Sequence, residues 1–234
     1  MIYRRILLKL SGESLMGKDG YGIDYNAVKH YTLEIKSAVE LGVQVGVVIG
    51  GGNIFRGVKG SDRGFDRRQG DQMGMLATLI NGLALQTVLE EHGIATQLLS
   101  ALSIDGIVSK ASFRKAVSYL ENNEVVIFVG GTGNPFFTTD SAAALRAIEI
   151  QADLLLKGTR VDGVYDADPE KVPTAKKFDQ ISFEEAYSKG LNILDLTAFT
   201  LCKENQMPIY VYNANITENL LKILQGKHIG TLIN

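Results

Sequence analysis

The stretch "VQVGVVIGGGNIFRG", residues 43–57, joins an apolar run to a glycine triplet. Apolar residues and one glycine fill nearly every position up to Ile49, a pattern typical of strands that are covered on both faces. The glycines at 50–52 free the backbone to turn sharply and to bring N–H groups close to a ligand. The stretch therefore predicts a buried strand that ends in a ligand-binding loop.

Similar runs recur along the chain with helical patterns between them. Strands are expected at 5–10, 43–50, 94–100, 125–130, 153–158, 208–213 and 230–234. Helical periodicity precedes Gly42, runs from Asp71 to His92 and covers "SAAALRAIEI" (141–150). This alternation predicts an α/β fold, a three-layer sandwich with a mostly parallel central sheet. Because no linker, composition shift or repeat divides the chain, we expect one domain over 1–234.

Composition narrows the classes of function. The 234 residues are 45% hydrophobic, and the net charge of −2 gives no basic field that would attract nucleic acid. Cys202 is the one cysteine, and the three histidines lie far apart, so neither a disulfide framework nor a protein metal site is expected. No secretory signal or transmembrane span is expected either, which favours a cytoplasmic protein without a membrane partner.

Glycine-containing loops follow the expected strands. In open parallel sheets ligands bind beyond the carboxyl ends of the strands, so these loops are expected to share one edge. Neither of the commonest phosphate-binding patterns, G-x-x-x-x-G-K-[ST] and G-x-G-x-x-G, occurs in the chain. The candidate loops are 9–14, 50–57, 130–140 and 157–169.

Charged residues in these loops predict anion chemistry. Lys9 ends the first expected strand just before Ser11 and Gly12, where its ammonium would face phosphate, although a strand lysine can also serve only solubility. Arg56 follows the glycine triplet and would supply a planar set of donors. For the triplet alone, a tight turn without a ligand is the competing interpretation.

Two aspartates precede helical patterns. Asp140, beside Thr138 and Thr139, can cap the helix over 141–150 or orient a nearby lysine, and the two roles are compatible. Asp71 likewise stands at a capping position and can accept hydrogen bonds from sugar hydroxyls. The segment "DGVYDADP" (162–169) fits an Asx-rich turn, a weak cation site or an adenosine pocket.

The motifs "LLKLSGE", "VGVVIGGGNIFRG", "GDQMGMLAT", "GTGNPFFTTD", "VDGVYDADP" and "LDLTAFTLC" resemble those of the bacterial uridylate kinases, which have the amino acid kinase fold. The resemblance runs from about Arg5 to the end of the chain. It implies transfer of the γ-phosphoryl group from Mg²⁺-ATP to UMP, giving ADP and UDP in pyrimidine nucleotide synthesis. It also implies a homohexamer, activation by GTP and inhibition by UTP.

The resemblance also assigns site residues. It implies catalytic roles for Lys9, Arg56 and Asp140. On the ATP side it places Lys9, Leu10, Ser11, Gly12, Gly52, Arg56, Thr159, Tyr165 and Asp168. On the UMP side it places Gly51, Asp71, Thr132, Gly133, Asn134, Pro135, Phe136, Phe137, Thr138 and Thr139. Whether Lys157 joins Lys9 in catalysis stays open.

Regulation is where the chain departs from the family. The family's turn for the GTP response is present as Gly17, Lys18, Asp19, Gly20, Tyr21 and Gly22. Gln86, Glu90 and Gln97 stand where family members with a well-defined GTP site have basic residues, and Phe113 stands in place of a tryptophan. GTP is therefore expected to activate weakly or not at all, because charge-assisted contacts to a triphosphate would be missing.

Two other functions compete with UMP phosphorylation. The same fold also phosphorylates carboxylates and carbamate, so an acyl-phosphate kinase is one alternative. A nucleotide-sensing regulator without turnover is the other. Asp71 favours a nucleoside acceptor over a small one, and intact Lys9, Arg56 and Asp140 favour an active enzyme.

Overall fold

A nearly continuous β-sheet organises the molecule. The computed structural model describes residues 3–55, 64 and 66–234. Within these residues the main sheet has nine strands in the order β4-β3-β5-β2-β1-β6-β10-β11-β9, and β7 pairs with β8 in a separate small sheet. Neighbouring strands of the main sheet are parallel except for the antiparallel pair β10 and β11. The expected mostly parallel sheet is confirmed.

The central strands are the apolar runs of the sequence. The strands are β1 (Arg5–Leu10), β2 (Gln44–Ile49), β3 (Thr96–Ser100), β4 (Ser109–Lys110), β5 (Val125–Val129), β6 (Leu154–Thr159), β7 (Val164–Tyr165), β8 (Lys177–Phe178), β9 (Gln180–Ile181), β10 (Ile209–Asn213) and β11 (Thr231–Ile233). In β2 and β5 every residue is buried, because helices cover both faces of the sheet there.

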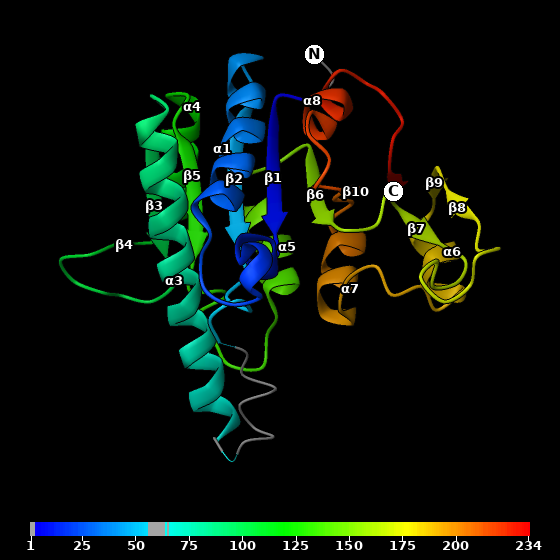
Figure 1. Cartoon of the computed structure of the whole chain (residues 1–234), viewed down its shortest axis with the longest axis horizontal. Coiled ribbons are helices and arrows are strands. Elements are labelled where there is room, and N and C mark those ends of the chain that lie inside the picture. The colour runs from blue at the N-terminus through cyan, green and yellow to red at the C-terminus, as the bar shows by residue number, and fades with distance from the viewer. Residues whose placement is uncertain (1–2, 56–63, 65) are drawn as a thin grey trace.

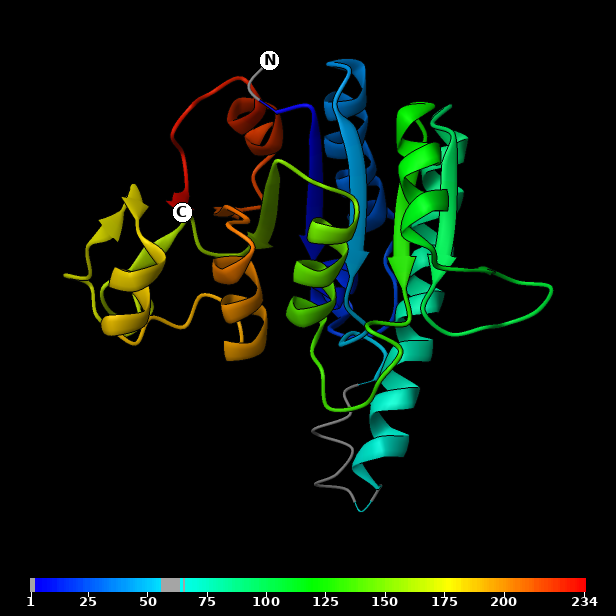
Figure 2. The same cartoon turned by 180° about the vertical axis from the view of Figure 1, so that it is seen from behind.

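Helices form a layer on each face of the sheet. One hydrophobic cluster packs α1 (Tyr25–Glu40), α3 (Arg67–Glu91) and α8 (Asn219–Leu224) on one face, the side seen in Figure 1. A second cluster packs α4 (Phe113–Glu121), α5 (Thr139–Glu149), α6 (Phe183–Ser188) and α7 (Leu196–Glu204) on the other side of the sheet, and Figure 2 shows α4, α5 and α7 from behind. Short 3₁₀ turns at Gly12–Leu15 and Gly17–Asp19 follow β1. The three-layer sandwich is thus confirmed.

The start of α3 differs from the expected one. The helix begins at Arg67, and Asp66 caps it by accepting hydrogen bonds from the backbone N–H groups of Arg68 and Gln69. Asp71 therefore lies in the second turn and is not a cap, so that expectation was wrong. The sequence misleads because Gly70 looks like a boundary, whereas it is a buried position inside the helix.

The helix α3 is also long and apolar enough to cross a membrane by length and composition alone. Its most apolar window has a mean hydropathy of 1.2, and half of that window is buried inside the protein. The buried half packs against α1, β2, β3 and β5. This packing accounts for the apolar composition, as in core helices of other α/β sandwiches.

Candidate active site

Two lysines lie side by side at the carboxyl end of the sheet. Lys9 of β1 and Lys157 of β6 are directly paired in the parallel register of these strands. Side chains alternate along a strand, so Leu7 and Leu155, two positions earlier, point to the same face, where both belong to the cluster under α5. Each apolar strand therefore delivers one ammonium group to the helix layer on that face.

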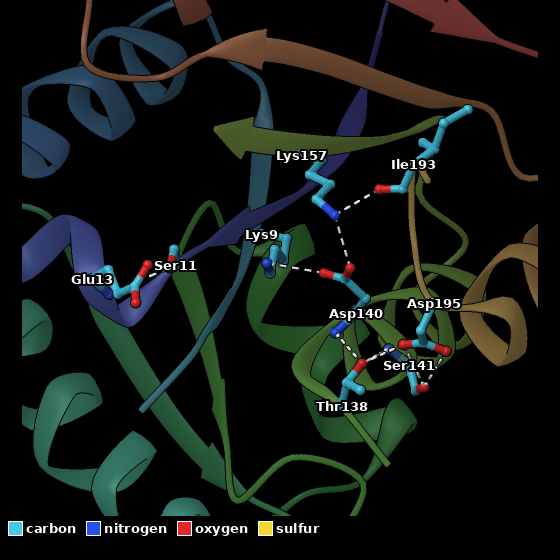
Figure 3. A network of polar contacts seen from close by, with 9 residues as sticks. All are labelled: Lys9, Ser11, Glu13, Thr138, Asp140, Ser141, Lys157, Ile193 and Asp195. Atoms are coloured by element: carbon cyan, nitrogen blue, oxygen red, sulfur yellow. Dashed lines mark hydrogen bonds and ion pairs between the residues drawn. The ribbon is translucent and has the colours of Figure 1, made fainter. Parts of the chain in front are cut away.

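Asp140 of α5 joins the two lysines. Its carboxylate oxygens lie 2.9 Å from Lys9 Nζ and 2.8 Å from Lys157 Nζ, and Figure 3 shows the lysines approaching from different sides. Lys157 also donates to the carbonyl oxygen of Ile193 at 2.6 Å. The three charged side chains are 13%, 14% and 18% exposed, so solvent screens them little. Two ammonium groups share one carboxylate, which leaves the cluster with a net positive charge.

Burial and charge act against each other in this cluster. Burial opposes ionisation of Asp140, but Lys9 and Lys157 outweigh it and hold the pKa of the carboxyl below its usual value. Burial lowers the pKa of Lys157, although Asp140 acts in the opposite direction. Asp140 is therefore ionised at neutral pH.

Thr138 caps α5. Its hydroxyl accepts hydrogen bonds from the backbone N–H groups of Asp140 at 3.0 Å and Ser141 at 3.3 Å. The carboxylate of Asp140 is in the first turn and is turned toward the lysines. Asp140 therefore does not cap α5, so the expectation of a capping role was wrong, and its carboxylate instead contacts both lysines.

The glycine loops after β1 and β2 pack backbone against backbone. A Cβ atom on Gly12 would lie 2.6 Å from the carbonyl oxygen of Gly50 and 2.8 Å from the nitrogen of Gly52. The close approach is possible because these positions carry no side chain. Below them, Asn53 and Asn81 exchange reciprocal amide hydrogen bonds of 2.7 and 2.9 Å, and Asn81 also donates to the carbonyl oxygen of Gly50.

Asp71 connects α3 to the loop before α5. It accepts a hydrogen bond from the backbone N–H of Phe136 at 2.8 Å and pairs with Arg67 Nε at 2.9 Å. Phe136 has a φ of +72°, a left-handed conformation that is uncommon for a bulky residue, and its ring lies 5.9 Å from the Arg67 guanidinium carbon. Thr78 of α3 fixes the same loop, since its hydroxyl accepts from Gly130 N at 2.7 Å.

A cavity of about 550 Å³ opens between three of the candidate loops. Lys9 lies in its wall, together with Arg67 and Asp71 of α3. Of the residues assigned to ATP, Lys9, Ser11, Gly12 and Gly52 line this cavity; of those assigned to UMP, Gly51, Asp71, Thr132, Asn134, Phe137, Thr138 and Thr139 do. Gly133, Pro135 and Phe136 lie in the same loop outside the lining, and Leu10 is buried in the core.

A second cavity, of about 500 Å³, lies beyond β6. Lys157, Thr159, Tyr165 and Asp168 line it. Asp168 accepts a hydrogen bond from the backbone N–H of Glu170 at 3.0 Å, the contact of an Asx turn. Since Lys9 belongs to the first cavity and Lys157 to the second, the Asp140 carboxylate stands between the two spaces.

The other predicted residues either lie near the glycine loops or fall outside the residues that the structure describes. Arg56 lies outside the described residues. The turn of Gly17–Gly22 has positive φ at its three glycines, and Gly22 exchanges hydrogen bonds with Asn53 at 3.1 and 2.7 Å. This turn is thereby tied to the loop after β2.

Sequence reasoning missed several residues that shape the site. Asp195 accepts hydrogen bonds from the hydroxyls of Thr138 and Ser141 (Figure 3). Asn81 and Thr78 hold two loops from positions inside α3. Polar residues in an otherwise apolar helical pattern were the available signal, but their partners are far away in the sequence.

The site thus consists of two neighbouring cavities that can hold anions. Glycine backbone lines the first cavity, and the ammonium groups of Lys9 and Lys157 lie where the two cavities meet. Charge stabilisation and positioning of this kind are what phosphoryl transfer requires, and the fold and site define a phosphotransferase.

The chain belongs to the amino acid kinase family, whose model matches residues 4–213. It is 55% identical to the uridylate kinase of Parabacteroides distasonis over 232 residues, which cover 99% of this chain and 98% of that enzyme. It is 56% identical to the uridylate kinase of Porphyromonas gingivalis, with 99% and 97% covered.

Solved structures give the same result. The UMP kinase from Bacillus anthracis superposes with a TM-score of 0.97 at 35% identity, covering all of this chain and 97% of the other. The UMP kinase from Ureaplasma parvum superposes with a TM-score of 0.94 at 38% identity, and both chains are fully covered. The resemblance to bacterial uridylate kinases is therefore confirmed over the whole chain.

Proposed function

We propose that this protein is a nucleoside monophosphate kinase that transfers the γ-phosphoryl group of Mg²⁺-ATP to UMP, giving ADP and UDP for pyrimidine nucleotide synthesis. The observation that carries the proposal is the Asp140 carboxylate held between Lys9 of one cavity and Lys157 of the other. The uridylate kinase relatives support UMP as the acceptor.

Each cavity takes one nucleotide in this proposal. UMP occupies the cavity lined by Asp71 and the loop before α5, where Asp71 accepts hydrogen bonds from the ribose. Adenosine occupies the cavity lined by Thr159, Tyr165 and Asp168. The phosphates of both meet at Lys9, Lys157 and the glycines at 50–52.

The chemistry asks mainly for charge stabilisation. The donor and acceptor phosphates repel each other, and the transferred group carries negative charge spread over its oxygens. Lys9 and Lys157 offset that charge, while Asp140 holds both ammonium groups in place before the substrates arrive. A phosphate oxygen of UMP is itself the nucleophile, so the step needs no general base.

Magnesium enters with ATP in this scheme. Among residues 3–55, 64 and 66–234 no group of three or more histidine, cysteine or carboxylate side chains is placed to hold a metal ion, and both oxygens of Asp140 face lysines. The ion would be held by phosphate oxygens of the nucleotide and would draw negative charge from them.

The proposal also covers assembly and regulation. The first strand, β1, and the last, β11, belong to the same nine-stranded main sheet of the described residues, which supports a single catalytic domain over 1–234. We propose a homohexamer that is inhibited by UTP and activated weakly or not at all by GTP. Gln86 donates to Glu90 and to the carbonyl oxygen of Thr96, and Gln97 donates to Glu124, so these amides are engaged within the chain and lie beside carboxylates. That surface supports little affinity for a triphosphate.

ADP release, coupled to a detection enzyme, tests the function across UMP, CMP, dTMP, acetylglutamate and carbamate. UMP is expected to be the preferred acceptor. Asp71→Ala is expected to raise the KM for UMP strongly and the KM for ATP much less, because the variant leaves sugar hydroxyls without their acceptor. Preference for acetylglutamate or carbamate would favour the acyl-phosphate alternative, and absence of turnover with every acceptor would favour the regulator.

A further inference from the structure

Asp195 links two helix N-termini. It caps α7 by accepting a hydrogen bond from the backbone N–H of Ala198 at 3.0 Å. The same carboxylate accepts from the hydroxyl of Ser141 at 3.1 and 3.2 Å and from the hydroxyl of Thr138. A helix cap needs one acceptor atom, whereas Asp195 uses its second oxygen to hold α5.

The contact to Thr138 reaches the charged cluster. A hydroxyl has one proton and two lone pairs. The Thr138 hydroxyl donates its hydrogen bond to Asp195. Its lone pairs therefore face the backbone N–H groups of Asp140 and Ser141. Asp195 therefore fixes the orientation of the hydroxyl that shapes the first turn of α5, and Asp140 is in that turn (Figure 3).

The turn before α7 also holds Lys157. The carbonyl oxygen of Ile193, two residues before Asp195, accepts a hydrogen bond from Lys157 Nζ at 2.6 Å. The segment 193–195 thus contacts Lys157 through the carbonyl oxygen of Ile193. Through the carboxylate of Asp195 it also contacts the start of α5, the helix that carries Asp140. Asp195 itself lines neither of the cavities assigned to the nucleotides.

We propose that Asp195 is a positioning residue for phosphoryl transfer, which acts through Thr138 and Ser141 to keep Asp140 between Lys9 and Lys157. The inference rests on the proposed function. No residue of α7 lines either nucleotide cavity. In this proposal the residue that caps α7 nevertheless helps to set the geometry of the reacting phosphates.

Asp195→Asn separates this role from capping. Asparagine caps a helix about as well as aspartate, so α7 keeps its acceptor. Its amide nitrogen then faces the Thr138 hydroxyl, a donor opposite a donor. We expect kcat to fall about 10- to 100-fold, because small displacements of positioned groups are costly. KM values for both nucleotides should stay within about twofold of those of the parent, since Asp195 touches neither substrate.

Asp153→Asn is the matched control. Asp153 accepts backbone N–H groups of Arg4 and Arg5 at 2.6 and 2.9 Å, at the opposite end of β1. The same chemical change there should leave kcat within about twofold of the parent value. On an Asp140→Asn background, adding Asp195→Asn should change the remaining kcat by less than about twofold, because the residue through which it acts has already been altered.

Measurements on the parent enzyme and on the variants test the proposed function and the role of Asp195 separately. Turnover of UMP by the parent tests the proposed function, and the ratio of variant to parent kcat, measured with whichever acceptor the parent phosphorylates, tests the inference. An Asp195→Asn enzyme with parental kcat would overturn the positioning role. So would a full additional loss on the Asp140→Asn background, or a kcat loss that disappears at temperatures well below the melting transition of the variant.

Discussion

At the scale of single residues, the site depends on two ammonium groups sharing one counter-ion. In a one-to-one pair of a buried lysine and a carboxylate, the two charges would cancel, and the lysine would attract an incoming phosphate only weakly. Here Asp140 pairs with both Lys9 and Lys157, so each ammonium retains attraction for a further anion. The cost of keeping two cations close together is offset when phosphate enters between them.

Lys9→Met tests this arrangement directly. The methionine retains most of the apolar stem and removes the charge. Preorganised donors of this kind contribute about 3 to 4 kcal/mol, so we expect kcat to fall roughly 100- to 1000-fold with a modest change in nucleotide KM. Steady-state kinetics and thermal melting measure both effects.

Lys157→Met is the comparison for that variant. It should also lower kcat, but with a larger loss of thermal stability, because it leaves the carbonyl oxygen of Ile193 without its donor. A Lys9→Met enzyme with a raised KM for ATP and parental kcat would mean that Lys9 contributes only uniform binding.

Cys202 behaves as an inert core residue. It is fully buried in α7, and burial, together with the charges of Asp140 and Asp195, raises the pKa of its thiol to about 12. The thiolate is the reactive form, so a disulfide reagent at about pH 8 should leave the folded protein unmodified and react once per chain in denaturant. Rapid reaction of the native protein would show that α7 opens readily.

The sequence identified some of these residues and not others, for a physical reason. Lys9 was predictable, because a charge at the end of an apolar strand needs an explanation within the strand itself. Asp195 was not, since its role depends on a contact between helices that are far apart in the sequence. Asp71 lines the first cavity, but its position in α3 was predicted wrongly, because local patterns do not reveal that Gly70 is buried inside the helix.

At the scale of elements, α3 ties the site together. Its first half reaches beyond the sheet and presents Arg67 and Asp71 to the first cavity, while its second half packs on the sheet (Figure 1). The long apolar strands and this helix were predictable from periodicity. The two-residue strands β4, β7, β8 and β9 were not, because such short pairings are set by tertiary context rather than by local preference.

Two glycines in α3 should respond oppositely to the same substitution. A Cβ atom on Gly82 would lie 2.5 Å from a methyl of Val129 and 2.8 Å from one of Leu98, both of them buried. Overpacking costs about 1 to 3 kcal/mol, which exceeds the gain of up to about 1 kcal/mol in helix propensity. Gly82→Ala should therefore lower the free energy of unfolding.

Gly74→Ala is the matched control in the same helix. The nearest atom to its added Cβ is a backbone oxygen at 3.9 Å, so helix propensity decides the outcome and the variant should be more stable by a few tenths of a kcal/mol to about 1 kcal/mol. Urea unfolding of both variants measures the difference. Equal effects of the two substitutions would contradict the close packing of α3 at Gly82.

At the scale of the whole molecule, α3 also leaves an apolar stripe uncovered. Met73, Leu76, Ile80 and Leu83 are 38% to 50% exposed, and their spacing of three and four residues places them on one face of the helix. A contiguous exposed stripe of this kind is typical of an interface between proteins. It supports the proposed homo-oligomer and gives a place to disrupt it.

Ile80→Glu should shift the protein toward smaller species in sedimentation velocity, because a charge would be buried in the proposed subunit contact. Val172→Glu, which changes an exposed apolar residue outside the stripe, should leave the assembly intact. If both variants sediment like the parent, the stripe is not part of the contact that holds the oligomer together.

The strand order of the main sheet has a consequence for synthesis on the ribosome. β1 is translated first and lies between β2 and β6, so its second edge gains a partner only after residue 154 has been added. At translation rates of about 5–20 residues per second, the roughly 100 residues between β2 and β6 take about 5 to 20 seconds. Throughout that interval the nascent chain carries an apolar strand with an open edge, a template for pairing with neighbouring chains. Lys9 is translated early, but it can meet its counter-ion in place only after most of the polypeptide has emerged.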